Sequence, residues 1–193
     1  MDTYKTISAP AEGYYTEKRS KFYAFAHPVE TVEEVKDLLA QYRKRFYDAR
    51  HVCWAYRLGA DGSEFRMNDD GEPSSTAGKP IHGQMLSRDL TNVVVFVVRY
   101  YGGINLGTSG LIVAYREATA DAFDHAVVEE RIIETFITHE FAYPAMNSVM
   151  KVVKDMQPRI VRQQFDNTCS ITLAIKQSMA EELQRRLDAL AFE

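Results

Sequence analysis

The sequence has little of what would place a protein in a membrane or outside the cell. No apolar run approaches the roughly 20 residues needed to cross a bilayer, and the polar start of the chain does not form a secretory signal. The only two cysteines, Cys53 and Cys169, lie in separate apolar strand patterns far apart in the sequence. That arrangement favours reduced core thiols over a disulfide. We therefore predict a cytoplasmic protein with no membrane contact.

The chain also lacks an excess of positive charge. Lys and Arg number 23 against 27 Asp and Glu, which gives a net charge of −4, and neither half is basic. Strong sequence-independent binding to nucleic acid leaves a basic footprint, so only local patches could contact RNA. The candidate RNA contacts are Lys18, Arg19, Lys21, Arg159 and Arg162. Phe165 could stack on a base, although its apolar strand pattern favours packing against helices.

Familiar catalytic and metal-binding motifs are missing as well. The chain has no G-x-S-x-G nucleophile elbow and no zinc cluster. The segment from Gly71 to Lys79 is two residues too long for a P-loop, and proline follows the lysine where a P-loop has Ser or Thr. His51 shares a strand face with Cys53, but no metal-ligand set accompanies them, so we expect a core or sheet-surface histidine. We predict no metal and no cofactor.

The most informative stretch that is present runs from residue 93 to residue 122. Its valine-rich start predicts a strand buried on both faces, and residues 111–122 have the spacing of one face of a helix. A glycine-rich loop joins them, so the free N–H groups and dipole at the start of the helix favour an anion there. The candidate anion ligands are Lys79, Arg99, Gly102, Gly103, Gly107, Thr108 and Ser109.

The glycines of this loop also have a purely structural interpretation. Gly102 and Gly103 could supply positive φ angles, and Gly107 could let the helix pack closely on the sheet. Arg99 ends a buried strand, so it either pairs with a carboxylate or faces a ligand anion, and both alternatives remain open.

An acidic cluster precedes this stretch. Asp69, Asp70 and Glu72 could hold Mg²⁺ beside a phosphate, but Asp and Gly are ordinary turn residues, and the structural interpretation is slightly favoured. We expect one shallow cleft to collect these carboxylates with Lys79, Arg99 and the loop over residues 102–109.

The remaining patterns predict two domains, residues 1–128 and residues 132–193. In the first we expect strands at 4–7, 14–17, 21–26, 51–58, 63–67 and 93–100, and helices at 32–46 and 81–86 besides the one ending near residue 125. In the second we expect a strand at 132–141, a helix at 144–156, a hairpin of 159–165 and 169–175, and a helix at 178–190. Capping boxes at Thr31 and Ser178 predict two of the helix starts. A last strand is expected to be short or absent.

Four motifs carry a family resemblance. They are RSKF at residues 19–22, HVCWAY at 51–56, DDGEPSSTAGKP at 69–80 and RYYGGINLG at 99–107. In this order they resemble the YigZ/IMPACT family, and the resemblance covers most of the chain. It implies an α+β protein with an amino-terminal βαβ domain like the second domain of ribosomal protein S5. It further implies a carboxyl-terminal ferredoxin-like domain like domain V of elongation factor G.

The resemblance also implies a function. Eukaryotic relatives regulate a stress-response pathway acting on translation initiation, so we predict a binding or regulatory protein associated with translation or RNA. Its expected partner is RNA, the ribosome or a translation-associated protein. The alternative is an enzyme acting on a phosphorylated or nucleotide small molecule, because small-molecule kinases of the implied fold hold phosphates in such a loop. Asn105 and Val113 stand where many members have a basic residue, and Ser75 and Ser109 replace glycines, which implies a weaker or different anion partner.

Overall fold

The valine-rich segment forms β6 (Val93–Tyr100), the central strand of a five-stranded antiparallel sheet. The sheet order is β2-β3-β6-β4-β5, with β2 (Ala11–Glu17), β3 (Ser20–Pro28), β4 (His51–Leu58) and β5 (Glu64–Asn68). The side chains from Val93 to Val98 have no solvent exposure. The prediction of a strand buried on both faces is therefore confirmed.

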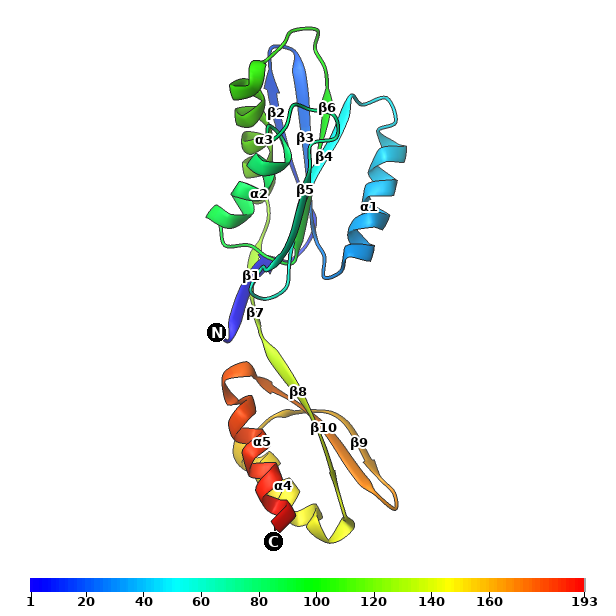
Figure 1. Cartoon of the computed structure of the whole chain (residues 1–193), viewed down its shortest axis with the longest axis vertical. Helices are drawn as coiled ribbons and strands as arrows, with labels where there is room; N and C mark the ends of the chain where they lie inside the picture. The colour runs from blue at the N-terminus through cyan, green and yellow to red at the C-terminus, as the bar shows by residue number, and fades with distance from the viewer. Residues whose placement is uncertain (193) are drawn as a thin grey trace. The chain divides into compact units, whose positions relative to one another are not determined.

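Helices cover both faces of this sheet (Figure 1). Because side chains alternate along a strand, Val94, Phe96 and Val98 pack in the cluster that includes α1 (Val32–Arg45). Their neighbours Val93, Val95 and Val97 pack in the cluster with α2 (Gly78–Ser87) and α3 (Gly107–Asp124). Strand β6 thus lies between two apolar layers, which explains why its sequence shows no alternation.

The start of α1 is fixed by the capping box that the sequence predicts. The hydroxyl of Thr31 accepts from the backbone N–H of Glu34 at 3.2 Å, and the Glu34 carboxylate accepts from the Thr31 N–H at 2.9 Å. The backbone N–H groups of Glu30 and Thr31 both donate to the Glu34 carboxylate and lower its pKa. A separate two-stranded sheet pairs β1 (Thr3–Ile7) with β7 (Val128–Ile132).

The computed structural model describes residues 1–192, which divide into two compact units. The larger unit is Tyr4–Arg131, and the smaller unit consists of Met1–Thr3 and the chain from Ile132 onward. The smaller unit contains a three-stranded antiparallel sheet with the order β8-β10-β9. Its elements are β8 (Glu134–Phe141), η1 (Tyr143–Ala145), α4 (Met146–Met156), β9 (Arg159–Phe165), β10 (Cys169–Lys176), η2 (Gln177–Met179), α5 (Ala180–Ala189) and η3 (Leu190–Phe192).

Helices α4 and α5 lie on one face of the smaller sheet (Figure 1). Their residues Val149, Leu183 and Leu187 pack with Ile171 and Leu173 of β10 in a buried core. The α+β fold class is confirmed. Through residue 192 no strand follows α5, and none of the described helices has the length and apolar character needed to span a bilayer.

The strand expected at 132–141 is confirmed as β8, which begins at Glu134 after β7 ends at Ile132. One expectation for the smaller unit is wrong, because Ser178 does not cap a helix. Instead, Ser178 donates from its backbone N–H and from its hydroxyl to the carboxylate of Asp2, at 2.9 and 2.6 Å. Helix α5 therefore begins later, at Ala180, without a side-chain cap. A contact across 176 residues of sequence leaves no local signal.

Candidate functional site

A buried ion pair connects the polar loop after β5 to the central strand. The Nη1 group of Arg99, near the end of β6, donates to Oε1 of Glu72 at 2.5 Å. The two side chains are only 7% and 2% exposed. Of the two alternatives for Arg99, the structure shows the pairing with a carboxylate, and Glu72 supplies it.

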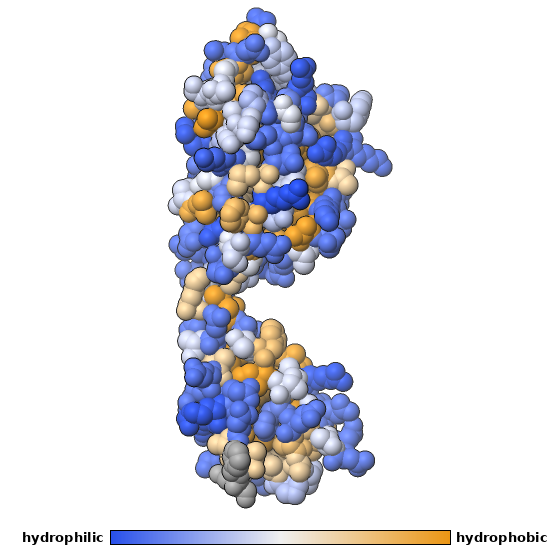
Figure 2. Space-filling model, in the orientation of Figure 1, coloured by the Kyte–Doolittle hydropathy of each residue, from blue (hydrophilic) through white to orange (hydrophobic). Residues whose placement is uncertain are grey.

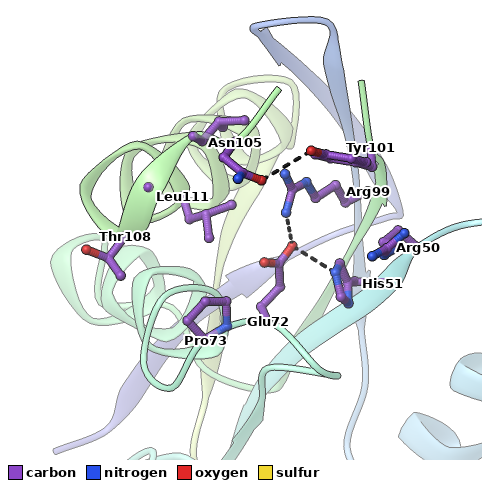
Figure 3. Close-up of a pocket in the computed structure, with 11 residues that line it drawn as sticks. Arg50, His51, Glu72, Pro73, Arg99, Tyr101, Asn105, Thr108 and Leu111 are labelled. Atoms are coloured by element: carbon purple, nitrogen blue, oxygen red, sulfur yellow. Dashed lines mark hydrogen bonds and ion pairs between the residues drawn. The ribbon is translucent and has the colours of Figure 1, made fainter. Parts of the chain in front are cut away.

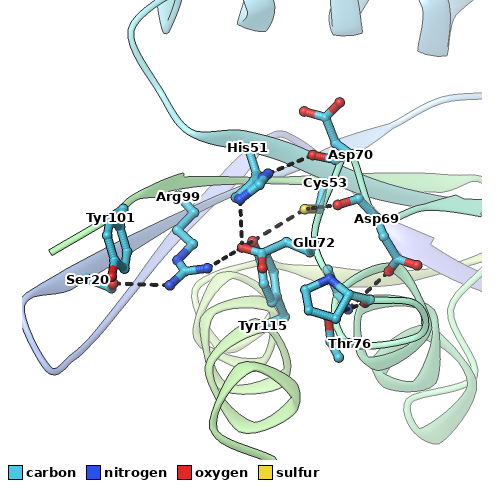
Figure 4. A network of polar contacts seen from close by, with 12 residues as sticks. Ser20, His51, Cys53, Asp69, Asp70, Glu72, Thr76, Arg99, Tyr101 and Tyr115 are labelled. Atoms are coloured by element: carbon cyan, nitrogen blue, oxygen red, sulfur yellow. Dashed lines mark hydrogen bonds and ion pairs between the residues drawn. The ribbon is translucent and has the colours of Figure 1, made fainter. Parts of the chain in front are cut away.

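Two further side chains, Tyr115 and Cys53, extend the network around this ion pair (Figure 4). The hydroxyl of Tyr115, from α3, donates to the same Glu72 oxygen at 2.9 Å. The thiol of Cys53 lies 3.3 Å from the Tyr115 oxygen. Burial raises the pKa of both Tyr115 and Cys53, so the phenol remains a donor and the thiol remains protonated. A protonated, buried thiol is a poor nucleophile.

The imidazole of His51 closes the network on the solvent side. Its Nδ1 donates to the carbonyl of Asp70 at 2.7 Å, because a carbonyl can only accept. Its Nε2 lies 3.4 Å from Glu72 Oε1 and donates there only when the ring carries a second proton. His51 is therefore a sheet-end histidine that faces the buried carboxylate. The strand pattern placed it on the face of Cys53 but could not show which loop folds over it.

The three carboxylates of the acidic cluster do not converge. Asp69 accepts from the backbone N–H groups of Ala77 and Gly78 through one oxygen and from that of Ser75 through the other, at 2.9–3.2 Å. Asp70 accepts from the backbone N–H of Val52 and from Arg43. Asp69 thus holds the loop at the start of α2, and Asp70 connects it to β4 and α1. Within residues 1–192 no group of three or more His, Cys, Asp or Glu side chains could hold a metal ion.

Replacing Asp69 by alanine is expected to destabilise the larger unit by about 2 kcal/mol, because three backbone donors lose one acceptor group. Urea unfolding followed by fluorescence measures this, since Trp54 is the only tryptophan and is buried in the larger unit. Asp37→Ala is the control, because Asp37 is exposed on α1. Equal stability of the two variants would show that Asp69 does not hold the loop.

A cavity of about 380 Å³ lies above the ion pair, where the end of β6 and the start of β4 meet the first turn of α3 (Figure 3). We name it the β6–α3 cavity. Its polar and charged lining residues are Arg50, His51, Glu72, Arg99, Tyr101, Asn105 and Thr108. In Figure 3 the hydroxyl of Thr108 points away from Arg99, so the cavity is lined by guanidinium, imidazole and amide groups rather than by converging hydroxyls.

The expectation of one cleft is wrong. Of the candidate anion ligands, Arg99, Gly107 and Thr108 line the β6–α3 cavity. Ser109 lines a second depression beside Lys18, and Lys79 lines a third beside Arg116. Ser109 is separated because successive residues of α3 point about 100° apart around the helix axis. Lys79 is separated because it lies on another helix, α2. Sequence reasoning also missed Arg50, Tyr101 and Asn105, which only the folded loops bring to this cavity.

The loop glycines have structural roles, but the roles expected for Gly102 and Gly107 are exchanged. A Cβ at Gly102 would lie 2.2 Å from the carbonyl carbon of Arg19, so Gly102 permits a close approach of two backbones. Gly107 has a positive φ of 75° with open space around it. Positive φ at Gly103, 87°, is as expected. Neither Gly102 nor Gly103 lines the β6–α3 cavity.

The candidate RNA contacts lie on both units. Lys18 and Arg19 form the exposed turn between β2 and β3, with φ angles of 46° and 67°, and Lys21 is exposed on β3. In the smaller unit, Arg159 forms an ion pair with Glu134 at 2.6 Å. Arg162 is exposed on β9.

The sheet of the smaller unit has one face without helices. Thr172 of β10 lies between Thr138 and Arg162, and the hydroxyls of the two threonines are 3.0 Å apart. Ala174 lies between Phe136 and Arg159. Cross-strand partners share a face, and Thr172 and Ala174 alternate with the core residues Ile171, Leu173 and Ile175. These residues therefore form the open face, on which Ala174 itself is buried. Figure 2 shows apolar and charged residues side by side on the visible surface of this unit.

Phe136 is the aromatic side chain that sequence reasoning missed. It is 61% exposed and belongs to the open face. Phe165 lies opposite Cys169, which is fully buried in the helix-covered core, so Phe165 belongs to the other face. Phe165 thus lies on the helix side of the sheet, but its side chain is 44% exposed and outside the core cluster, so the expected packing against the helices is not confirmed.

Comparison with known proteins decides the family. Residues 18–123 match the Impact N-terminal domain. The chain belongs to the IMPACT family. It is 31% identical to an IMPACT family member of Haemophilus influenzae over 88% of this chain and 84% of that protein. It is 28% identical to IMPACT family member YigZ of Escherichia coli over 97% of this chain and 93% of that protein.

Eukaryotic and solved relatives match as well. Protein IMPACT of Rattus norvegicus is 35% identical over 48% of this chain and 30% of its own length. A crystal structure of a hypothetical protein is 28% identical, covers 97% of this chain and 92% of its own, and superposes with a TM-score of 0.75. A structure of the two-domain translational regulator Yih1 is 26% identical over 63% of this chain and 47% of its own, with a TM-score of 0.38.

The match to the Impact N-terminal domain includes the whole buried network. Arg50, Glu72, Arg99 and the start of α3 all lie within residues 18–123. The open sheet face of the smaller unit lies outside that range. The two candidate sites of this IMPACT family member therefore belong to different parts of the chain.

Proposed function

We propose that this chain is a binding or regulatory protein associated with translation, and that it contacts single-stranded RNA through the open face of its smaller sheet. The association with translation rests on membership of the IMPACT family, given the regulatory role that the family resemblance implies. The RNA contact rests on one observation, the exposed Phe136 beside Arg159 and Arg162 on a sheet face without helices. Two buried, unpaired cysteines support a cytoplasmic location.

The chemistry of this face suits unpaired bases. An exposed aromatic ring on an open sheet offers a stacking surface. On the same face Arg162 offers a contact to a phosphate, whereas Arg159 is paired with Glu134. The hydroxyls of Thr138 and Thr172 add neutral hydrogen-bonding groups. Lys18, Arg19 and Lys21 are proposed as a second basic patch, on the larger unit. With a net charge of −4, the attraction comes from these local groups.

The geometry of the buried network favours binding over catalysis. The Cys53 thiol is held protonated by burial. Glu72 is paired with Arg99, and Tyr115 donates to the same Glu72 oxygen. These three groups therefore stabilise the fold, and the enzyme alternative finds no free nucleophile or base among them.

Phe136→Ala is expected to weaken binding of a labelled single-stranded RNA about tenfold, because a base–aromatic stack contributes on the order of 1–3 kcal/mol. Fluorescence anisotropy at several salt concentrations measures the affinity. Arg162→Ala should reduce the salt slope by about 0.7, the value for one phosphate contact on a single strand.

Phe165→Ala is the matched control, because Phe165 is also exposed but lies on the helix side of the same sheet. It should bind RNA like the wild type. Loss of affinity in Phe165→Ala but not in Phe136→Ala would contradict the assignment of the open face. No affinity of the wild type at low salt would exclude direct RNA contact and point to a protein partner.

A further inference from the structure

We propose that the β6–α3 cavity of the larger unit binds a phosphate monoester. The first observation is a set of donors at the rim. The exposed guanidinium of Arg50 lies 5.5 Å from the ring centroid of Tyr101. The Tyr101 hydroxyl donates to Oδ1 of Asn105 at 3.2 Å, which turns that amide so that its nitrogen has two donors for another partner.

The second observation is an unsatisfied donor in the buried arginine. Arg99 is 7% exposed and lines the cavity, and in Figure 3 its guanidinium points toward the middle of the lining residues. Its Nη1 donates to Glu72 and its Nη2 to Ser20, but its Nε has no hydrogen-bond partner in the described chain. Buried polar groups are normally paired. An acceptor from a ligand would satisfy this group.

The third observation is the start of α3. Its N-cap residue, Leu106, makes no side-chain hydrogen bond to the helix end, in contrast to Thr31 at the start of α1. The first N–H groups of a helix have no partner within the helix, and two residues that carry them, Gly107 and Thr108, line the cavity. These N–H groups and the helix dipole favour an anion.

Charge and size define the ligand class. Arg50 and Arg99 outweigh Glu72 by one positive charge, and the Glu72 oxygen Oε1 already accepts from Arg99 and Tyr115. An anion is therefore favoured. The volume of about 380 Å³ exceeds that of a phosphate ion, and Pro73, Leu106 and Leu111 give the cavity an apolar side. A phosphate group on a larger organic molecule fits both parts.

This inference is independent of RNA contact, because it concerns the larger unit alone. The test is an amide NMR titration of the full chain with inorganic phosphate, adenosine monophosphate and adenosine. The amides of Gly107 and Thr108 should shift with the two phosphates and not with adenosine. The monophosphate should bind more tightly than inorganic phosphate, because only it reaches the apolar side.

Arg50→Ala and Asn105→Asp should each lower the affinity for adenosine monophosphate about tenfold. The first variant removes a contact to the anion, and the second places a negative charge beside it. Both positions are exposed, so the fold is retained. Arg116→Ala is the control, because Arg116 is an exposed arginine of α3 outside the cavity, and its affinity should equal that of the wild type. Unmoved Gly107 and Thr108 amides, or equal affinity in Arg50→Ala, would overturn the proposal.

Discussion

Replacing Glu72 by alanine is expected to destabilise the larger unit by about 3–5 kcal/mol, the usual loss when one partner of a buried ion pair is removed. The Arg99 side chain is 7% exposed, so removing the carboxylate leaves its charge largely desolvated. Tyr115 would lose its acceptor in the same step. The loss should be large because an uncompensated charge remains buried, not because the pair itself contributes that much stability.

Urea unfolding followed by the fluorescence of Trp54 measures the free energy of unfolding of the larger unit. Trp54 is 7% exposed and packs in the same cluster as Phe96 of β6. The control is Asp124→Ala, because Asp124 pairs with Arg88 at a comparable distance, 2.8 Å, but is 63% exposed. An exposed pair contributes less than about 1 kcal/mol. A loss in Glu72→Ala no larger than in Asp124→Ala would show that the pair is not buried in solution.

A double variant tests whether the loss of stability in Glu72→Ala comes from the uncompensated charge of Arg99. Glu72→Leu combined with Arg99→Met removes both charges and retains apolar volume. It should be more stable than Glu72→Ala, because replacing a whole buried pair by apolar groups is often nearly neutral. If the double variant is less stable than the single one, the network must contribute through its hydrogen bonds rather than through the removal of an isolated charge.

The fold was predictable wherever one local pattern dominates. The valine run of β6 has no alternation because both its faces are buried, and the capping box at Thr31 is completed by atoms three residues apart. Such features depend on neighbours in sequence. The capping-box pattern gave a wrong prediction at Ser178, because its hydroxyl donates instead to Asp2 from the other end of the sequence. A local motif only shows what a side chain can do.

The candidate site was less predictable than the fold because it depends on contacts between loops. The sequence left open whether Arg99 pairs with a carboxylate or faces a ligand anion. Three carboxylates were near in the chain, and only the folded loop selects Glu72. Asp69 instead caps backbone groups around the start of α2. Arg50 lies outside the four motifs, and Asn105 lies in the RYYGGINLG motif without a recognised ligand role. Their place in the β6–α3 cavity follows from where β4 begins and how the glycine-rich loop turns.

Replacing Gly102 by alanine is expected to destabilise the larger unit by about 3 kcal/mol. The added Cβ would lie 2.2 Å from the carbonyl carbon of Arg19 and 2.5 Å from the N atom of Ser20. These are backbone atoms of the β2–β3 connection, so no side chain can rotate away, and relief requires two backbone segments to separate. Overpacking of this kind costs on the order of 1–3 kcal/mol. Because the neighbouring atoms belong to the backbone, we expect the cost of Gly102→Ala to lie at the upper end of this range.

Two other glycines separate this clash from the general effect of adding a methyl group. Gly103 has a φ of 87° with nothing near its Cβ position, so Gly103→Ala should lose only about 1 kcal/mol for the left-handed backbone. Gly83 lies inside α2 with open space, so Gly83→Ala should gain up to about 1 kcal/mol from helix propensity. The order of stability by Trp54 fluorescence is therefore Gly83→Ala, Gly103→Ala, Gly102→Ala. If Gly102→Ala matched Gly103→Ala, the close approach of the loop to Arg19 would be wrong, and the position of Tyr101 and Asn105 at the cavity would lose its support.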